Sequence, residues 1–250
     1  MWASKLGKGV NQMKRREFMQ GRRNGLKTMA QRPAASGGKK TIGILGYDGV
    51  QALDIVGPTD AFSLASAHLA SERPHAARAY EVLVLGLTRR VFCAESGLAI
   101  RPHRALEAAP ALDTVIIPGG KGLRLNAATQ MQITRWLEAR ARDIRRIASV
   151  CTGIYALAPT GLVDGRRVTT HWRFTSEIAR RFPRLRVDPN ALFIKDGRFY
   201  TSAGITAGID LALALIEEDH GPQVALAVAR DLVVYLKRPG GQEQYSDAIP

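Results

Sequence analysis

Short apolar runs alternate along the chain with longer stretches in which apolar residues recur at helical spacing. The runs that predict buried strands are KKTIGILGY (39–47), EVLVLGL (81–87), DTVIIPGG (113–120) and RRIASV (145–150). Helical spacing follows from Val50 to about Leu69 and again over 128–144. Strands that are apolar throughout are buried on both faces. The alternation therefore predicts a doubly wound, flavodoxin-like α/β fold, a mostly parallel sheet with helices on both faces.

The second half of the chain continues this pattern and adds two turn signals. VFCAESGLAI (91–100) contains Gly97 and predicts a hairpin or a bent strand pair, and ALFIKDGRFYTSAG (191–204) predicts two strands joined by an Asp-Gly turn. GRRVTTHW (165–172) predicts a strand running into a turn. Helices are predicted at 174–182, 205–221 and 221–236. We expect a single domain over 40–250, preceded by an arm of residues 1–39.

Positive charge is concentrated in the arm. Of the 36 Lys and Arg residues, eleven lie in residues 1–40 with a single Glu, so the remainder holds 25 Lys and Arg against 21 acidic residues. Such an arm either binds polyanions without sequence specificity or is simply solvated, and both interpretations stay open. It has no apolar periodicity, and we expect it to be disordered. The chain has no run of eighteen apolar residues, so no membrane association is expected.

The arm also contains KRREFM (14–19), which resembles a twin-arginine export motif. An export signal continues into an apolar core, whereas GRRNGLKTMAQRPAASGG follows here. We therefore expect a cytoplasmic protein whose arm is a degenerate signal or reflects a start codon placed too early; a working signal would place it in the periplasm. Two cysteines are too few for a disulfide framework, which fits a reducing compartment.

Cys151 follows RRIASV where a helix of small residues is predicted to begin. In doubly wound sheets the functional site lies at the carboxyl ends of the strands. A side chain on a sharp strand-to-helix turn is exposed there, and the helix amides, that of Thr152 among them, favour a thiolate. This predicts an accessible thiol of low pKa. The alternative is a small, buried structural residue.

Two other strand ends carry candidate groups. Gly119 and Gly120 follow the buried run TVII, and their amides are expected to donate to a developing anion, although a plain tight turn would look the same. Asp54 lies among Leu53, Ile55 and Val56, an unfavourable place for a carboxylate without a partner. Asp60 is expected to be a helix cap or a structural hydrogen-bonding group.

The order of LDIVGPTDAF, IIPGG, SVCTG, GLVDGRRVTTHW, TSAGITAGIDLAL and VVYLKRPGGQEQYS resembles the DJ-1/PfpI superfamily over about residues 41–246. Within it the chain is similar to isonitrile hydratases and to the sensory domain of AraC/GlxA-like transcription regulators. The resemblance implies that Cys151 is the elbow cysteine and that Asp54 is the carboxylic acid facing it. Thr152 matches the residue after the nucleophile, and His171 is placed near the site, where a buried structural histidine remains the alternative. A homodimer is also implied.

The resemblance implies a cysteine-dependent hydration of small isonitriles with no cofactor and no metal. A glutaminase is not expected, because HWRFTSE does not contain the His-x-Glu of a Cys-His-Glu triad. Cys93 lies in a predicted strand without a glycine elbow, so we expect it to be structural.

Two other functions stay open: a catalytically silent ligand-sensing domain, and a redox or protein-repair role. VVYLKRPGGQEQYS resembles the segment that leads into the helix-turn-helix of the regulators, yet no helical pair with a recognition-helix pattern follows it. We therefore expect a small-molecule substrate or ligand as the partner, and no sequence-specific DNA binding by this chain.

Overall fold

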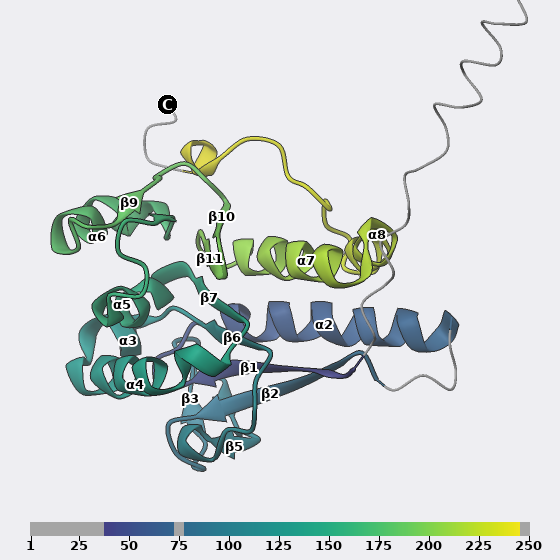
Figure 1. The fold of residues 1–250 in the computed structure, drawn as a ribbon, viewed down its shortest axis with the longest axis horizontal. Helices are drawn as coiled ribbons and strands as arrows, with labels where there is room; N and C mark the ends of the chain where they lie inside the picture. Colours follow the sequence, from purple (N-terminus) through teal and green to yellow (C-terminus); the bar gives the residue numbers. More distant parts are fainter. Residues whose placement is uncertain (1–37, 73–77, 246–250) are drawn as a thin grey trace, which may run out of the picture. The chain divides into compact units, whose positions relative to one another are not determined.

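The computed structural model describes residues 38–72 and 78–245, and these contain a seven-stranded sheet in the order β10-β11-β7-β6-β1-β2-β5 (Figure 1). The strands are β1 (Lys40–Gly46), β2 (Tyr80–Gly86), β5 (Arg104–Ala105), β6 (Thr114–Ile117), β7 (Arg146–Val150), β10 (Phe193–Asp196) and β11 (Phe199–Ser202). Neighbours are parallel throughout except β10 and β11, which form the predicted hairpin. The predicted arm, residues 1–39, lies outside the described residues up to residue 37, so its disorder stays a prediction.

Helices cover both faces of the sheet, as the doubly wound prediction requires. On one face α2 (Ala52–Glu72), α7 (Ala207–His220) and α8 (Pro222–Asp231) pack against one another. On the other lie α3 (Lys121–Leu125), α4 (Ala127–Arg140) and α5 (Ile154–Leu157), while α6 (Thr175–Arg181) packs beside the small strand β9 (Arg186–Val187). The fold class predicted from the sequence is confirmed.

The strand order fixes where a site can form. From β1 the chain passes to β2 on one side and later to β6 on the other, so the order reverses between β1 and β6. Ligands of such sheets bind outside the carboxyl ends of the strands at this reversal. The strands there are buried throughout, β6 as TVII and β7 as RIASV, which explains their continuous apolar pattern.

Several local details differ from the sequence prediction. The short strands β5 and β9 and the helix α3 carry too few residues to show a periodicity, and none of them was predicted. The run 221–236 forms a helix only as far as Asp231. Asp60 lies inside α2 rather than at its end, so the helix-cap assignment is wrong.

Cys93, which was predicted to be structural, is exposed. It lies in the two-residue pairing of β3 (Phe92–Cys93) with β4 (Ala99–Ile100), where Phe92 is buried and Cys93 is exposed. Successive side chains of a strand point to opposite faces, so Cys93, which follows the buried Phe92, faces outward. Cys93 is therefore a surface residue and not part of the core, while its structural, non-catalytic role stays a prediction.

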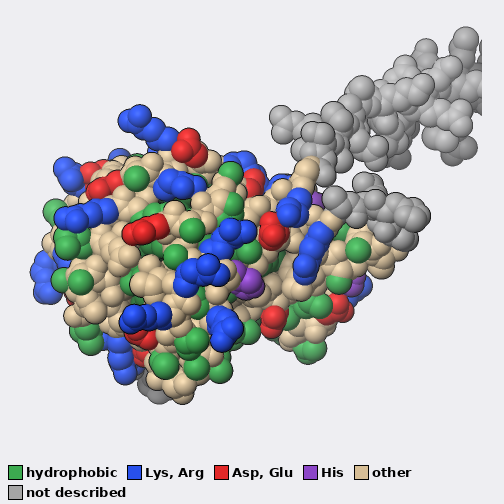
Figure 2. Space-filling view, turned by 90° about the horizontal axis from the view of Figure 1, so that it is seen from below, with side chains coloured by type: hydrophobic (Ala, Val, Ile, Leu, Met, Phe, Trp, Pro, Cys, Tyr) green, Lys and Arg blue, Asp and Glu red, His purple; other side chains and the backbone are tan. Residues whose placement is uncertain are grey.

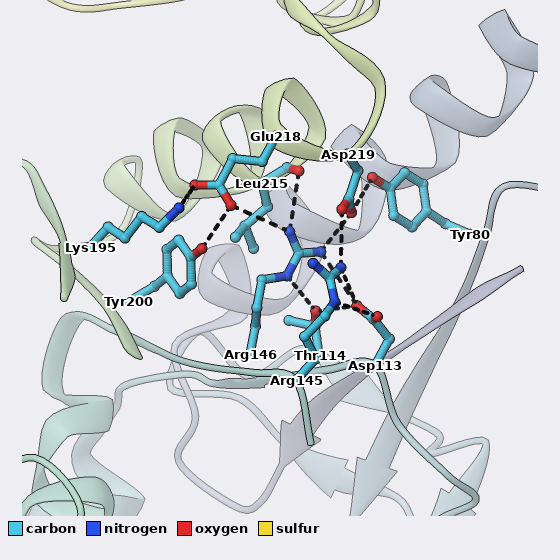
Figure 3. A network of polar contacts seen from close by, with 10 residues as sticks. All are labelled: Tyr80, Asp113, Thr114, Arg145, Arg146, Lys195, Tyr200, Leu215, Glu218 and Asp219. Carbon is cyan, nitrogen blue, oxygen red and sulfur yellow. Dashed lines mark hydrogen bonds and ion pairs between the residues drawn. The ribbon is translucent and has the colours of Figure 1, made fainter. Parts of the chain in front are cut away.

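A polar cluster is buried at the amino ends of the strands, opposite the carboxyl ends (Figure 3). Arg146, the first residue of β7, has a side chain only 2% exposed and donates to Asp219 at 2.6 Å and to Thr114 at 3.0 Å. Asp219 also accepts hydrogen bonds from Tyr80 at 2.9 Å and from Arg145 at 3.0 Å. The Arg146 guanidinium thus joins β6, β7 and the end of α7.

Charged side chains of both signs share the surface. On the face drawn in Figure 2, acidic side chains lie among the Lys and Arg side chains. Many exposed cations are paired, as in Lys39–Glu81 at 2.8 Å and Arg184–Asp164 at 2.8 Å. Within the described ranges, none of the helices has the length and apolar character needed to cross a membrane.

Candidate active site

Cys151 occupies a strained turn directly after β7. Its φ is +56°, a conformation that non-glycine residues rarely adopt. Its amide donates to the Ala203 carbonyl at 3.0 Å, and its carbonyl accepts from the Thr170 hydroxyl at 2.7 Å. Strain of about 1–3 kcal/mol persists where surrounding contacts fix the backbone, and it concentrates at functional sites. This geometry is that of a nucleophile elbow.

The Cys151 thiol is buried, contrary to the expectation of an accessible thiol of low pKa. Cys151 is 7% exposed. Burial raises the pKa of its thiol to about 12, and the nearby negative charge of Asp54 also raises it. The amides of Thr152 and Ile205 and the Thr152 hydroxyl oppose this shift without overcoming it. In place of the expected helix, a 3-10 turn spans Cys151–Gly153 and the four-residue α5 follows it. A helix this short has no substantial dipole to stabilise a thiolate.

Asp54 lies in the first turn of α2 and is fully buried. Its Oδ2 accepts from the Gly119 amide at 2.8 Å, whereas its Oδ1 has no hydrogen-bond partner among the described residues. Burial raises the pKa of this carboxyl to about 7; the Gly119 amide lowers it in part and the Glu95 charge raises it. An unpartnered buried oxygen is costly for a carboxylate, so the environment favours the protonated acid. No hydrogen bond joins Asp54 to the Cys151 sulfur within the described part of the chain.

Gly119 and Gly120 do not offer free amides. The Gly119 amide is taken by Asp54, and the Gly120 amide donates to the Thr152 hydroxyl at 2.9 Å. A Cβ on Gly119 would lie 2.5 Å from the Thr152 nitrogen and 2.8 Å from the Cys151 Cβ. The predicted role of these glycines as anion donors is therefore wrong: they let β6 approach the elbow closely and fix Asp54 and Thr152 beside it.

Ile205 is a site residue that the sequence analysis missed. It has a φ of +52°, and its amide donates to the Cys151 sulfur, together with that of Thr152. These two amides and the Thr152 hydroxyl donate to the sulfur. A β-branched residue gives no signal for a positive φ, and only the preceding Gly204 marks the turn in the sequence.

His171 lies near the site, as predicted. Its Nδ1 accepts from the Arg173 amide at 3.2 Å, so the ring proton of the neutral form is on Nε2. Burial and the Arg173 charge lower the pKa of the ring, which keeps it neutral at pH 7. A Cβ on Gly204 would come within 2.2 Å of its Cδ2, so Gly204 makes room for this ring.

A cavity of about 190 Å³ opens over Cys151. The candidate residues Thr152, Gly120 and His171 line it, whereas Asp54 is not among the lining residues. The other lining residues could not be expected from the local sequence: Gln51, Glu95, Lys121, Arg124, Arg173, Phe174 and Ile205. They come from short turns and from α3, whose positions only the fold reveals. Within the described residues, His, Cys, Asp and Glu side chains do not gather in threes as a metal site requires.

Comparison of the chain with models of known protein families identifies its family. A family model described as DJ-1/PfpI family matches residues 40–218. The chain belongs to the DJ-1/PfpI family. Among solved structures of this fold, DJ-1beta of Drosophila melanogaster matches with a TM-score of 0.67 at 21% identity, covering 79% of this chain and all of that one. An AraC family transcriptional regulator from Pseudomonas putida gives 0.65 at 18% identity, covering 77% and 99%.

Two kinds of curated relative share sequence with this DJ-1/PfpI protein. The isonitrile hydratase of Pseudomonas putida is 34% identical over 192 residues, which cover 76% of this chain and 77% of the relative. The transcriptional regulator GbdR of Pseudomonas aeruginosa is 37% identical over 156 residues, 62% of this chain. That match spans only 41% of the regulator's own length.

Proposed function

We propose that this protein hydrates small isonitriles, R–NC, to N-substituted formamides with Cys151 as nucleophile. The observation that carries the proposal is the pairing of a strained elbow cysteine with Asp54, a buried carboxyl whose pKa is raised to about 7 and whose Oδ1 is unpartnered. Similarity to an isonitrile hydratase over about three quarters of both chains supports it.

The two side chains supply complementary steps. The carbon of the isonitrile accepts a proton from the Asp54–Cys151 pair while the Cys151 sulfur bonds to the same carbon, giving the thioimidate R–N=CH–S. Water then adds to this carbon, the C–S bond breaks, and R–NH–CHO leaves as the thiol regains its proton. The net change is the addition of one water to R–NC.

Protonation of Asp54 lowers the cost of forming a thiolate at the buried Cys151. The negative charge of ionised Asp54 is one cause of the raised Cys151 pKa, so protonating Asp54 removes that part of the penalty. The tautomer with neutral Asp54 and a Cys151 thiolate has the same net charge as the one with a carboxylate and a thiol. The amides of Thr152 and Ile205 stabilise the sulfur anion of that tautomer.

A second function, ligand sensing without turnover, is favoured by one observation. The pKa of the Cys151 thiol is raised to about 12, which suits an inert residue better than an unaided nucleophile. The 37% identity to a transcription regulator over 156 residues is in line with it.

Turnover separates the two functions. The full chain is incubated with isocyanoacetate and, separately, with its methyl ester, and the formyl proton of the formamide product is followed by NMR. Hydration predicts many product molecules per protein molecule. A ligand-induced rise in melting temperature without any formamide would contradict hydration and favour sensing.

A further inference from the structure

We propose that the ligand of the cavity over Cys151 carries a carboxylate or an equally small anionic group that Arg124 and Arg173 bind. This rests on the proposed function in that the ligand reacts at Cys151. The chemical class follows from the cavity's charge. Its lining includes three cationic side chains, Lys121, Arg124 and Arg173, against one carboxylate, Glu95.

The single carboxylate is already neutralised. Glu95 accepts from the Lys121 amide and forms an ion pair of 3.6 Å with the Lys121 ammonium. Among the described residues, no carboxylate lies within ion-pair distance of Arg124 or Arg173, whereas exposed cations such as Arg184 have partners. The ring of His171 is neutral and adds no charge. Two guanidinium charges therefore remain at the cavity.

Aromatic rings orient both guanidinium groups. The Arg124 guanidinium carbon lies 4.9 Å from the centre of the Phe174 ring, and that of Arg173 lies 5.1 Å from the centre of Trp172. Cation–π attraction holds each guanidinium over its ring, and the N–H groups of a guanidinium bind a carboxylate with two parallel hydrogen bonds. Phe174 also lines the cavity, so Arg124 is held at its wall.

The cavity's size restricts the ligand to a small molecule. Its volume of about 190 Å³ suits a small organic molecule. Isocyanoacetate has a reactive carbon at one end and a carboxylate at the other, and it is of this size. Its methyl ester has a similar reactive end without the charge.

Alkylation of Cys151 tests the charge preference without requiring turnover. Iodoacetate and iodoacetamide have nearly the same shape and differ in charge; in both, the sulfur displaces iodide as the new S–C bond forms and the thiol proton leaves. The two rates at Cys151 are measured by peptide mass spectrometry on the full chain. The exposed Cys93 in the same molecule provides the reference ratio for an ordinary thiol.

We expect the ratio of the alkylation rates with iodoacetate and iodoacetamide to be about tenfold higher at Cys151 than at Cys93. The Cys151 ratio divided by the Cys93 ratio is the normalised ratio. It should fall towards one in Arg124→Gln and further in the double variant with Arg173→Gln, with partial recovery in Arg124→Lys. Arg142→Gln is the matched control, because Arg142 is exposed and precedes β7, at the end opposite Cys151. Melting temperatures verify that each variant is folded.

Every outcome of these experiments either supports or overturns the proposal. Three results would overturn the proposal. They are a normalised ratio near one in the wild type, a ratio that does not change in the Arg124 and Arg173 variants, and failure of iodoacetate to alkylate Cys151. Hydration of isocyanoacetate and its methyl ester at equal kcat/KM would overturn it while leaving the hydratase function intact. A charge preference at Cys151 without any isonitrile turnover would keep the anion site and remove the hydratase function.

Discussion

Asp54→Asn is expected to lower kcat/KM for isonitrile hydration by about 10²–10⁴-fold while the protein stays folded. Asn can still accept the Gly119 amide through its carbonyl oxygen, so the contact of 2.8 Å that positions the side chain is preserved. Asn has no transferable proton, and the proposed protonation of the isonitrile carbon is lost. The assay is formamide production by wild type, Asp54→Asn and Asp60→Asn. Asp60 is on the same helix but exposed, so its variant should keep wild-type activity.

The same variant has a pH signature in stability that does not depend on turnover. The folded-state pKa of Asp54, about 7, exceeds its ordinary value of 3.8, so the native state holds the proton more tightly than the unfolded chain. This contribution is fully present below about pH 4 and is lost as pH rises through about 7. The advantage of wild type over Asp54→Asn in unfolding free energy should therefore shrink by about 4 kcal/mol across that range in urea titrations. Equal pH slopes, or turnover within twofold of wild type, would remove Asp54 from the mechanism.

Arg146→Met is expected to lower the free energy of unfolding by about 3–5 kcal/mol. The side chain of Asp219 is only 4% exposed, and loss of the 2.6 Å contact would leave its charge held by Arg145 and Tyr80 alone (Figure 3). The Thr114 hydroxyl and the Leu215 carbonyl would lose a donor as well. Urea unfolding of the variant measures the loss.

Arg145→Met is the matched control for this prediction. Arg145 binds Asp113 and Asp219, two of the three carboxylates that Arg146 also contacts, but the Arg145 side chain is 48% exposed, so its removal should cost at most about 1 kcal/mol. Adding Asp219→Leu to Arg146→Met should recover part of the loss, because no buried charge is then left without its partner. Equal losses in Arg145→Met and Arg146→Met would show that burial does not decide the strength of this cluster.

The apolar pattern was sufficient to predict the buried strands β1, β2, β6 and β7, the hairpin of β10 and β11, and the main helices. Continuous runs such as TVII in β6 correspond to strands buried on both faces, and periodic segments such as 128–144 correspond to amphipathic helices. Asp54 was found because a carboxylate among apolar neighbours requires a special environment. Cys151 was found because it follows a buried strand directly.

Features set by tertiary contact were not predictable in the same way. The pKa of Cys151 depends on its burial and on a carboxyl from another element, and neither is written in the residues around it. The amides of Gly119 and Gly120 were recognised, but their acceptors, Asp54 and Thr152, are distant in sequence. The positive φ of Ile205 is imposed by the surrounding fold.

The measurement that tests the central claim most directly is isonitrile hydration by Cys151→Ser compared with Cys93→Ser. Both variants lose one thiol, but only Cys151 lies at the elbow, beneath the cavity. Cys93→Ser is expected to hydrate methyl isocyanoacetate within twofold of wild type, and Cys151→Ser to be slower by at least about 10³-fold. Cys151→Ser turning over at the wild-type rate would contradict the assignment of Cys151 as the nucleophile.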